Sequence, residues 1–330
     1  YSRPIKDYLI GSLEFSVPFF ARFPRLYNGA MSSALVRRAL ERHAGMVDSP
    51  LLSRFDFQAT LSRWGVREAT PSLLAAQTGA QRARSVILVQ DAFTRYFEAR
   101  VLCAFIEFAS RLGYTVWLAP FMPNGKPLHV LGFLEAFNRT ALRNAAMLGE
   151  LASCGVPLVG LDPAMTLVYR QEYAKLASLE KPPAVLLPQE WLLDVLPAKV
   201  PESSEGDFRL LTHCTEKTTA PAAAALWPEV FARAGLKLRQ QASGCCGMSG
   251  TYGHESLNVG TSRHIYSQSW GPLLKSGKTR GTEFLATGYS CRSQAERMEG
   301  RQLRHPVEVL LHFYGRTESS LPVANGAGVL

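Results

Sequence analysis

The chain has 330 residues, of which 47% are hydrophobic and 19% charged, and its formal net charge at pH 7 is +9. This balance excludes a disordered or fibrous protein, and the length suffices for two domains that each have a core. The 36 Lys and Arg residues are scattered and form no recognisable nucleic-acid-binding module. We interpret them as a solvated basic surface and expect no nucleic-acid partner.

We read neither a signal peptide nor a membrane span in the N-terminal part of the sequence. Its longest apolar stretch, residues 9–20, is interrupted by Glu14 and Pro18 and is shorter than the roughly 20 residues that a transmembrane helix needs. Unpaired cysteines are typical of a reducing compartment, so we expect a cytoplasmic protein and leave peripheral association with the inner membrane open. Because the first residue is Tyr1 and not Met, we also expect a segment of a longer polypeptide.

We predict that residues 1–84 form an N-terminal helical arm or linker. A helix is expected over residues 32–43, where apolar positions recur at helical spacing. Beyond residue 84 the pattern changes to alternating strands and helices. The expected elements are a strand at 86–89, a helix at about 96–112, a strand at 114–118, a helix at about 134–154 and a strand at 156–160. This order and spacing are typical of parallel βαβ units.

The same order recurs later in the chain. The expected elements there are a strand at 208–211, a helix at about 222–234, a strand at 236–238, a helix that contains His264 and a strand at 283–288. We therefore predict an α/β fold with two pseudo-repeated parallel-sheet halves, one at residues 85–180 and one at residues 207–330. Residues 181–206, which end in a Pro-Glu-Ser-Ser-Glu-Gly run, predict the connector between them.

Four of the six cysteines lie in the second half, in the order Cys214, Cys245, Cys246 and Cys291, and glycines flank the adjacent pair. Each cysteine position follows a predicted strand, so the fold would place all four on loops at the carboxyl ends of parallel strands. Thiolates are the usual soft ligands of zinc and of iron–sulfur clusters. The sequence therefore predicts a metal site at this edge of the second sheet.

Two histidines are further candidates. His213 precedes the first of these cysteines and His254 lies eight residues beyond the adjacent pair, so each is a possible fourth ligand or a hydrogen-bond donor to the site. The remaining cysteines, Cys103 in an apolar helical run and Cys154 before a glycine turn, are interpreted as structural.

The first half carries no cysteines at the corresponding places. Asp91 stands where Cys214 does, residues 120–123 stand where the adjacent pair does, and residues 162–165 stand near the place of Cys291. We therefore expect one half to keep the site and the other to have lost it.

With these residues in view, the chain resembles the duplicated cysteine-rich CCG domains found in a subunit of heterodisulfide reductase and in the iron–sulfur subunits of glycolate and D-lactate oxidases. The match spans about residues 85–315. Residues 245–255, 286–294 and 304–307 look most like the C-terminal end of the large single-chain bacterial FAD and iron–sulfur D-2-hydroxyglutarate dehydrogenases. The resemblance implies an iron–sulfur cluster held by the four cysteines. It also implies FAD and ferredoxin-like domains upstream, in the same polypeptide or complex.

Two positions depart from the family pattern. Ser293 stands where a second thiol of a C-x-x-C element would fall, which leaves four sulfurs, the number that a 4Fe-4S cluster takes. Met165 stands in the first half where the family has a cysteine, and a thioether is a weaker ligand. We therefore expect one cluster site, in the second half.

The function that this resemblance implies is electron transfer or cluster binding within a flavin-linked 2-hydroxy acid dehydrogenase, with electrons passed to an acceptor. Two alternatives remain open: a structural zinc site, and a metal-free scaffold that closes over the flavoprotein. Whether the chain is itself an enzyme is left open, and we expect it to be inactive alone because no flavin or dinucleotide site can be read in it.

Overall fold

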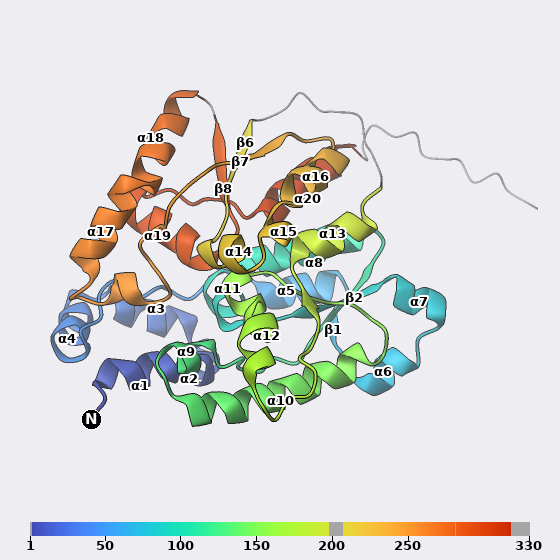
Figure 1. Cartoon of the computed structure of the whole chain (residues 1–330), viewed down its shortest axis with the longest axis horizontal. Helices are drawn as coiled ribbons and strands as arrows, with labels where there is room; N and C mark the ends of the chain where they lie inside the picture. The colour runs from blue at the N-terminus through green and yellow to red at the C-terminus, as the bar shows by residue number, and fades with distance from the viewer. Residues whose placement is uncertain (1, 198–206, 281, 318–330) are drawn as a thin grey trace, which may run out of the picture.

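The computed structural model describes residues 2–197, 207–280 and 282–317, and it is an α/β fold with two separate sheets whose strands all pair in parallel (Figure 1). The predicted fold class is confirmed. The first sheet has the order β1 (Arg67–Glu68), β3 (Thr115–Leu118), β2 (Ser85–Val89), β4 (Leu158–Gly160) and β5 (Val185–Leu186). The second has the order β7 (Leu238–Gln240), β6 (Phe208–Leu211) and β8 (Glu283–Ala286).

Helices surround both sheets. Those before the first long strand are α1 (Ile5–Gly11), α2 (Leu13–Phe20), α3 (Pro24–Ser32), α4 (Ala34–Ala44), α5 (Phe57–Arg63), α6 (Pro71–Ala75) and α7 (Gly79–Ala83). The first half continues with η1 (Phe93–Phe97), α8 (Ala99–Arg111), α9 (Lys126–Val130), α10 (Leu134–Ala152), α11 (Pro163–Thr166), α12 (Val168–Gln171) and η2 (Tyr173–Lys175). The rest are α13 (Pro188–Val195), α14 (Cys214–Thr219), α15 (Pro221–Ala224), α16 (Trp227–Arg233), η3 (Tyr252–His254), α17 (Val259–Gln268), α18 (Trp270–Arg280), α19 (Tyr289–Glu299) and α20 (Pro306–Thr317).

The three central strands of the first sheet have the same order as the three strands of the second. In the first sheet β2 lies between β3 and β4, and in the second β6 lies between β7 and β8. The pairing register matches as well. Val89–Gly160 and Leu211–Ala286 are the last pairs of their ladders, and the carbonyl one residue earlier, of Leu88 or Leu210, accepts the N–H that follows the neighbouring strand, of Ala119 (3.0 Å) or Gln241 (2.9 Å). Val89 and Leu211 are therefore equivalent positions, and residues counted onward from them can be compared between the halves.

One apolar core joins the halves. All five residues of β2 are buried, as expected for a central parallel strand that has helices over both faces. On one face α8 packs against α20 of the second half, and the cluster that they form includes Phe105 from the first half and Phe208 and Trp227 from the second. The two sheets are thus held in a fixed relation, with the carboxyl ends of their strands turned toward the N-terminal helices.

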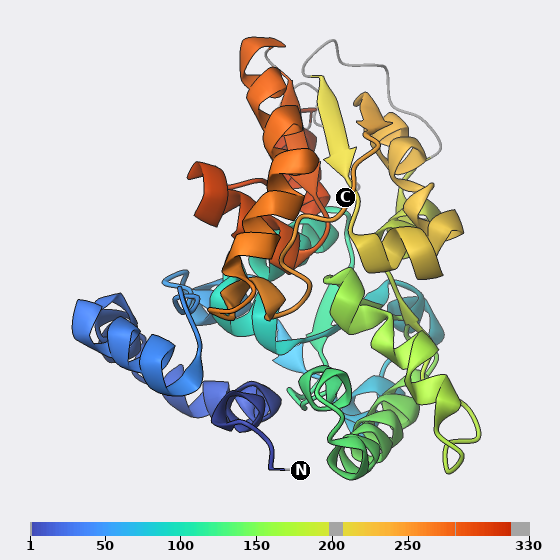
Figure 2. The ribbon, with the colours of Figure 1, turned by 60° about the vertical axis from the view of Figure 1, so that its left-hand side comes forward.

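The predicted arm is helical over α1–α4, and the helix expected at 32–43 is α4. Figure 2 shows these blue helices beside the first half and below the orange helices of the second. They are joined to the second half by backbone hydrogen bonds from Val47 N–H to the His254 carbonyl (2.7 Å) and from Ser256 N–H to the Gly45 carbonyl (2.8 Å). Farther along residues 1–84, β1 pairs with β3, so the last part of the predicted arm contributes a strand to the first sheet.

The predicted connector also contains regular structure. It includes β5, an edge strand of the first sheet, and α13, whose Trp191 and Leu192 are buried in the shared core. The acidic run at residues 201–206 lies outside the described residues.

The helix expected at about 222–234 is divided into α15 and α16. A continuous helix would need a backbone N–H at Pro228 to bond the Ala224 carbonyl, and proline has none. That carbonyl instead accepts a hydrogen bond from the Gln240 side chain at 2.5 Å. The following strand also begins two residues later than expected, at Leu238. Within the described residues, no helix has both the length and the apolar character needed to cross a membrane.

Candidate cysteine site

The four predicted cysteines follow three strands of the second sheet. Cys214 is the first residue of α14 and lies three residues beyond the end of β6, and Cys291 is the third residue of α19, after β8. Cys245 and Cys246 lie in the irregular segment after β7. The prediction that all four lie on loops was therefore wrong for Cys214 and Cys291, which occupy first helical turns. The backbone N–H groups of a first turn have no partners within the helix, and they favour negative charge nearby.

The side chains of the four cysteines are joined in a row by hydrogen bonds. Cys214 contacts Cys245, Cys245 contacts Cys246, and Cys246 contacts Cys291. Cys246 and Cys291 are buried, whereas Cys214 and Cys245 are partly exposed. The fold thus brings together all four sulfurs that the sequence singled out, with one end of the row accessible.

The row favours one thiolate. Hydrogen bonds from Cys214 and then from Cys246, together with the N–H of Gly247 at 3.3 Å from the sulfur, lower the pKa of Cys245 to about 2. The same hydrogen bond to Cys245 raises the pKa of Cys214, and bonding to Cys245 and Cys291 raises that of Cys246. Cys245 is therefore the sulfur most ready to act as a ligand.

Two glycines allow the close approach of these segments. Gly247, after the adjacent pair, has a φ of 84°, and a Cβ there would lie 2.3 Å from the carbonyl oxygen of Ser262. Gly288 precedes α19, and a Cβ there would lie 2.1 Å from the ring of His213. Any larger residue at either position would push the cysteine-bearing segments apart.

The two histidines serve the scaffold in different ways. Buried His213 caps α14: its Nδ1 accepts the Thr215 N–H at 3.1 Å, so its Nε2 carries the proton and donates to the Ser290 hydroxyl at 3.2 Å. With both nitrogens engaged, His213 orients the site and has no lone pair free for a metal. His254 hydrogen-bonds through Nδ1 to the Val47 carbonyl at 3.1 Å, which ties the site loop to the N-terminal arm.

Two buried groups support the row: the Glu216 carboxyl and the ion pair of Arg292 with Glu98. Neither of them was identified from the sequence. Glu216 accepts hydrogen bonds from Gln189 (2.7 Å), Thr287 (2.6 Å) and Trp227 (3.3 Å), and burial raises its pKa to about 7. Arg292, next to Cys291, pairs with Glu98 of the first half. Glu216 and Glu98 contact residues that are distant in sequence, and such contacts leave no periodic pattern. Neither carboxylate could therefore be recognised from the sequence.

The strand register corrects one predicted equivalence. Asp91 lies two residues after Val89, and His213 lies two residues after Leu211, so Asp91 corresponds to His213 and not to Cys214. Both residues cap the helical segment that follows, Asp91 by accepting the N–H groups of Phe93 and Thr94 at 2.8 and 2.9 Å.

The other equivalences follow the same count. Met165 and Cys291 both lie five residues beyond paired strand ends and third in their helices. Gly125 and Gly247 share a left-handed backbone, with φ of 82° and 84°. The cysteine pair therefore corresponds to Pro123 and Asn124, so the predicted range 120–123 ends one residue too early. In the first half a carboxylate lies against the loop that contains Gly125. Glu14 of α2 accepts the N–H groups of Asn124 (3.3 Å) and Gly125 (2.8 Å).

Among the described residues, no group of three or more His, Cys, Asp or Glu side chains is arranged around a single metal ion. The four thiols form a row and not a closed shell. Their donor set still fits a metallocofactor, because all four are sulfurs, one is held as a thiolate, and two lie in first helical turns.

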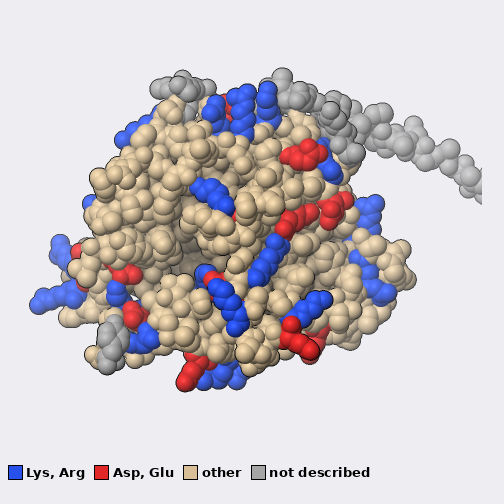
Figure 3. Space-filling view, viewed as in Figure 1, with Lys and Arg blue, Asp and Glu red and all other residues tan. Residues whose placement is uncertain are grey.

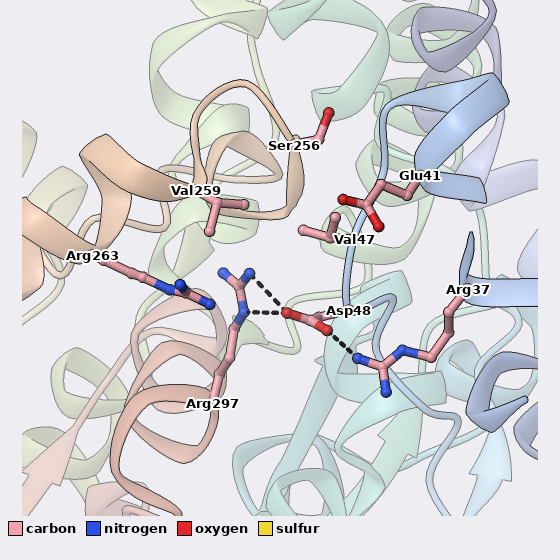
Figure 4. A pocket seen from close by; sticks show the side chains of 8 residues that line it. All are labelled: Arg37, Glu41, Val47, Asp48, Ser256, Val259, Arg263 and Arg297. Carbon is pink, nitrogen blue, oxygen red and sulfur yellow. Dashed lines mark hydrogen bonds and ion pairs between the residues drawn. The ribbon is translucent and has the colours of Figure 1, made fainter. Parts of the chain in front are cut away.

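A small polar pocket of about 330 Å³ lies where the arm meets the second half (Figure 4). Asp48 of the arm is held there by the Arg297 guanidinium, at 3.0 and 2.9 Å, and by Arg37. Arg297 also donates to the Gly253 carbonyl at 2.5 Å. These contacts anchor the arm beside the loop that carries the cysteine pair.

On the face shown in Figure 3, Lys and Arg are spread over the surface among Asp and Glu. This agrees with the interpretation of the basic residues as a solvated surface.

An α/β protein with a row of four cysteines at the carboxyl edge of one of its two parallel sheets is the class that these observations define. No model of a known protein family matches the chain. It is similar to part of the D-2-hydroxyglutarate dehydrogenase of Pseudomonas putida, with 61% identity over 96% of this chain, and to that of Escherichia coli, with 43% identity over 95%. The chain spans 31% of the length of each of these relatives.

A weaker relative is one of the subunits of the anaerobic glycerol-3-phosphate dehydrogenase of Escherichia coli, 24% identical over 94% of this chain and 77% of that protein. A solved structure of a hypothetical protein from Helicobacter pylori aligns with 87% of this chain and 56% of that one at a TM-score of 0.43 and 10% identity, too low to establish a common fold. The sequence relatives are thus dehydrogenases or part of a dehydrogenase, as the resemblance implied.

Proposed function

We propose that the chain is the iron–sulfur cluster-binding, electron-transfer module of a flavin-linked 2-hydroxy acid dehydrogenase. The observation that carries this proposal is the joined row of Cys214, Cys245, Cys246 and Cys291 at the carboxyl edge of the second sheet. Four cysteines are the usual ligand set of a 4Fe-4S cluster.

The surroundings of the row suit a cofactor with negatively charged sulfurs. The N–H of Gly247 donates to the sulfur of Cys245, and the first turns of α14 and α19 present further N–H groups. A cluster bound there would accept and release single electrons, and hydrogen bonds to its sulfurs together with burial would set its reduction potential. The chain's own residues thus bind and tune the cofactor.

The names of the relatives support the substrate class of this proposal, and its partners are those that the resemblance in the sequence implies. Two long relatives are named for D-2-hydroxyglutarate, and the chain matches about a third of each, 31% of the length. FAD and the ferredoxin-like domain would then lie on the remaining part of such a polypeptide. Because the match covers 77% of the much shorter glycerol-3-phosphate dehydrogenase component, the same module would also occur as a separate polypeptide of a complex. The cytoplasm is the compartment proposed for it, since thiols stay reduced there.

A structural zinc site is the second candidate, and the contacts between neighbouring thiols favour it. Four thiolates around one Zn²⁺, with bonds of about 2.3 Å, lie within about 4 Å of one another. The described residues contain no such set, and the thiols contact one another only in sequence along the row. A 4Fe-4S cluster binds each of its four ligand sulfurs to a different iron, so the row would have to spread to receive it. Metal analysis therefore has to decide between the two candidates.

The test is iron and acid-labile sulfide analysis of the chain purified without oxygen. We expect a brown protein that contains both, and we expect Cys291→Ser to lose them because one of four ligands is removed. Cys154→Ser is the matched control, since that thiol is bonded to the Pro71 and Glu150 carbonyls and lies outside the row. A colourless, zinc-loaded chain, or oxidation of D-2-hydroxyglutarate by the chain without added flavoprotein, would contradict the proposal.

A further inference from the structure

A large cavity opens against the cysteine row. It has a volume of about 470 Å³ and lies between α1–α3, the edge of the first sheet and the segments that carry the cysteines. Cys214 lines it, as do Met165 and Tyr289. Figure 3 shows a hollow on the face where the N-terminal helices adjoin the second half. A cavity of this size suits a small organic molecule.

The inner end of the cavity carries hydrogen-bonding groups. His213, Ser290 and Ser293 line it beside Cys214, and the His213 ring is already fixed by its bonds to Thr215 and Ser290. The Ser293 hydroxyl takes the place of the second thiol in the family pattern. Hydroxyl groups here could donate to a ligand carbonyl next to the cysteine row.

The outer part of the cavity is apolar and continuous with the surface. Leu9, Phe20 and Val130 line it and are 48%, 44% and 67% exposed. The rings of Phe93 and Tyr289 form one wall, stacked at 5.3 Å with 23° between their planes. An apolar molecule could therefore pass from the surface to the cysteine row along a continuous apolar path.

Charge narrows the class of ligand. Among the described residues that line the cavity, Lys126 and Asp162 are the ones with a full charge, and both are engaged: Lys126 with Glu172, and Asp162 with the N–H groups of Ala164 and Tyr289 at 2.9 and 2.6 Å. A nucleotide or a dicarboxylate would find no free cation there. A neutral ring with carbonyl groups at one end and an apolar tail meets both ends of the cavity.

We propose that this cavity binds the electron acceptor of the module and that the acceptor is a quinone. The inference rests on the proposed function, because a quinone there would receive electrons that the flavin-linked reaction releases. Reduction of one quinone to its quinol takes two electrons and two protons. Oxidation of one 2-hydroxy acid to the 2-oxo acid yields the same number of each, so the two half-reactions balance.

The experiment is a calorimetric titration of decylubiquinone into the chain purified without oxygen, with iron and sulfide measured on the same samples. Ala164 of α11 and Ser16 of α2 both line the cavity, so Ala164→Phe and Ser16→Phe should each fill it and weaken binding by at least about tenfold. Ala146→Phe is the control for the first, because Ala146 is exposed on α10 and does not line the cavity. n-Decanol tests whether the cavity recognises more than apolar volume.

Saturable binding of one decylubiquinone, lost in both cavity-filling variants and kept in Ala146→Phe, would support the proposal if n-decanol binds at least about tenfold more weakly. No binding, equal binding by the filled variants, or equal binding of n-decanol would overturn it. The iron and sulfide measurements separate the two proposals. If the chain contains iron and sulfide but does not bind decylubiquinone, only the proposed acceptor site is refuted. Quinone binding without iron or sulfide refutes the proposed function and leaves the cavity as a quinone-binding site.

Discussion

In the first half of the molecule, a buried carboxylate bonds the loop that corresponds to the loop of the cysteine pair in the second half. Glu14 is 1% exposed, and it accepts the backbone N–H groups of Asn124 and Gly125, the equivalents of Cys246 and Gly247. Burial raises the pKa of Glu14 to about 7, against the two hydrogen bonds, which lower it. The N-terminal arm thus places against this loop a group whose ionisation at neutral pH destabilises the fold.

The pH dependence of the free energy of unfolding should show that ionisation of Glu14 destabilises the folded state. The folded pKa of Glu14 is raised, so the folded state binds the proton more tightly than the unfolded state, and the stability that this supplies below pH 4.5 is lost as pH rises to about 7. Between pH 5.5 and pH 8, we expect the free energy of unfolding to fall by about 2 kcal/mol more in the wild type than in Glu14→Gln. Urea unfolding at the two pH values measures the difference.

Glu135→Gln is the control, because the Glu135 side chain is 94% exposed and solvent screens its charge. It should keep the wild-type slope. Equal pH dependence of the wild type and Glu14→Gln would mean that Glu14 is already charged in the folded protein.

Single residues of the site could be predicted from the sequence only where their chemistry is distinctive. The four cysteines could be found because thiols are few and follow predicted strands. Glu14 could not be recognised as a buried group, because in the sequence it is only a charged residue that interrupts an apolar stretch. Asp91 was matched to Cys214, one residue away from its true counterpart His213, because strand ends cannot be located to one residue without the pairing register.

At the scale of elements, α19 is held in place by an ion pair that crosses between the halves. Arg292 is 3% exposed. Its guanidinium bonds both carboxylate oxygens of Glu98 at 2.5–3.0 Å and donates to the Ala286 and Thr287 carbonyls, each at 2.9 Å. Glu98 immediately precedes α8. Because Cys291 is the neighbour of Arg292, this pair sets where the last thiol of the row lies.

Arg292→Lys should therefore destabilise the chain although it keeps the charge. An ammonium group cannot reproduce the planar, two-sided bonding of the guanidinium, so buried acceptors would lose partners. We expect the free energy of unfolding to fall by about 2–4 kcal/mol and the iron content to drop. Urea unfolding and iron analysis are the measurements.

The matched control is Arg304→Lys. Arg304 also bonds a carboxylate with two nitrogens, those of Glu283 at 2.6 Å each, but both side chains are at least 30% exposed. Solvent screens such a pair, so the change should cost less than about 1 kcal/mol. If the two variants were equally stable, burial of the Arg292 pair would have no special role.

Elements with a strong periodic pattern could be predicted and those set by tertiary contacts could not. The long helix α10 and the buried strands β2 and β6 lie within a few residues of their expected positions. The two-residue strands β1 and β5 had no pattern to detect, because they exist only by pairing with β3 and β4. The break between α15 and α16 could have been read from Pro228, which removes one helical hydrogen bond.

At the scale of the whole molecule, the repeat in the sequence does not make two independent bodies. The largest apolar cluster includes residues of α8, α13 and α20 together with those of β2 and β6. Each sheet packs against residues of the other half, so unfolding of one half would expose apolar surface of the other to water. The N-terminal helices α1–α4, in contrast, contribute no residue to this shared cluster and expose Phe15, Phe19 and Leu26.

We therefore expect the two sheets to unfold together and the arm to open first. Hydrogen exchange followed by mass spectrometry at increasing urea should show β2 and β6 losing protection at the same urea concentration, because a single cooperative unit has one free energy of opening. Peptides from α1–α3 should lose protection at lower urea and serve as the internal reference. Loss of protection in β6 while β2 remains protected would show that the halves have separate cores, and the shared cluster would then not govern stability.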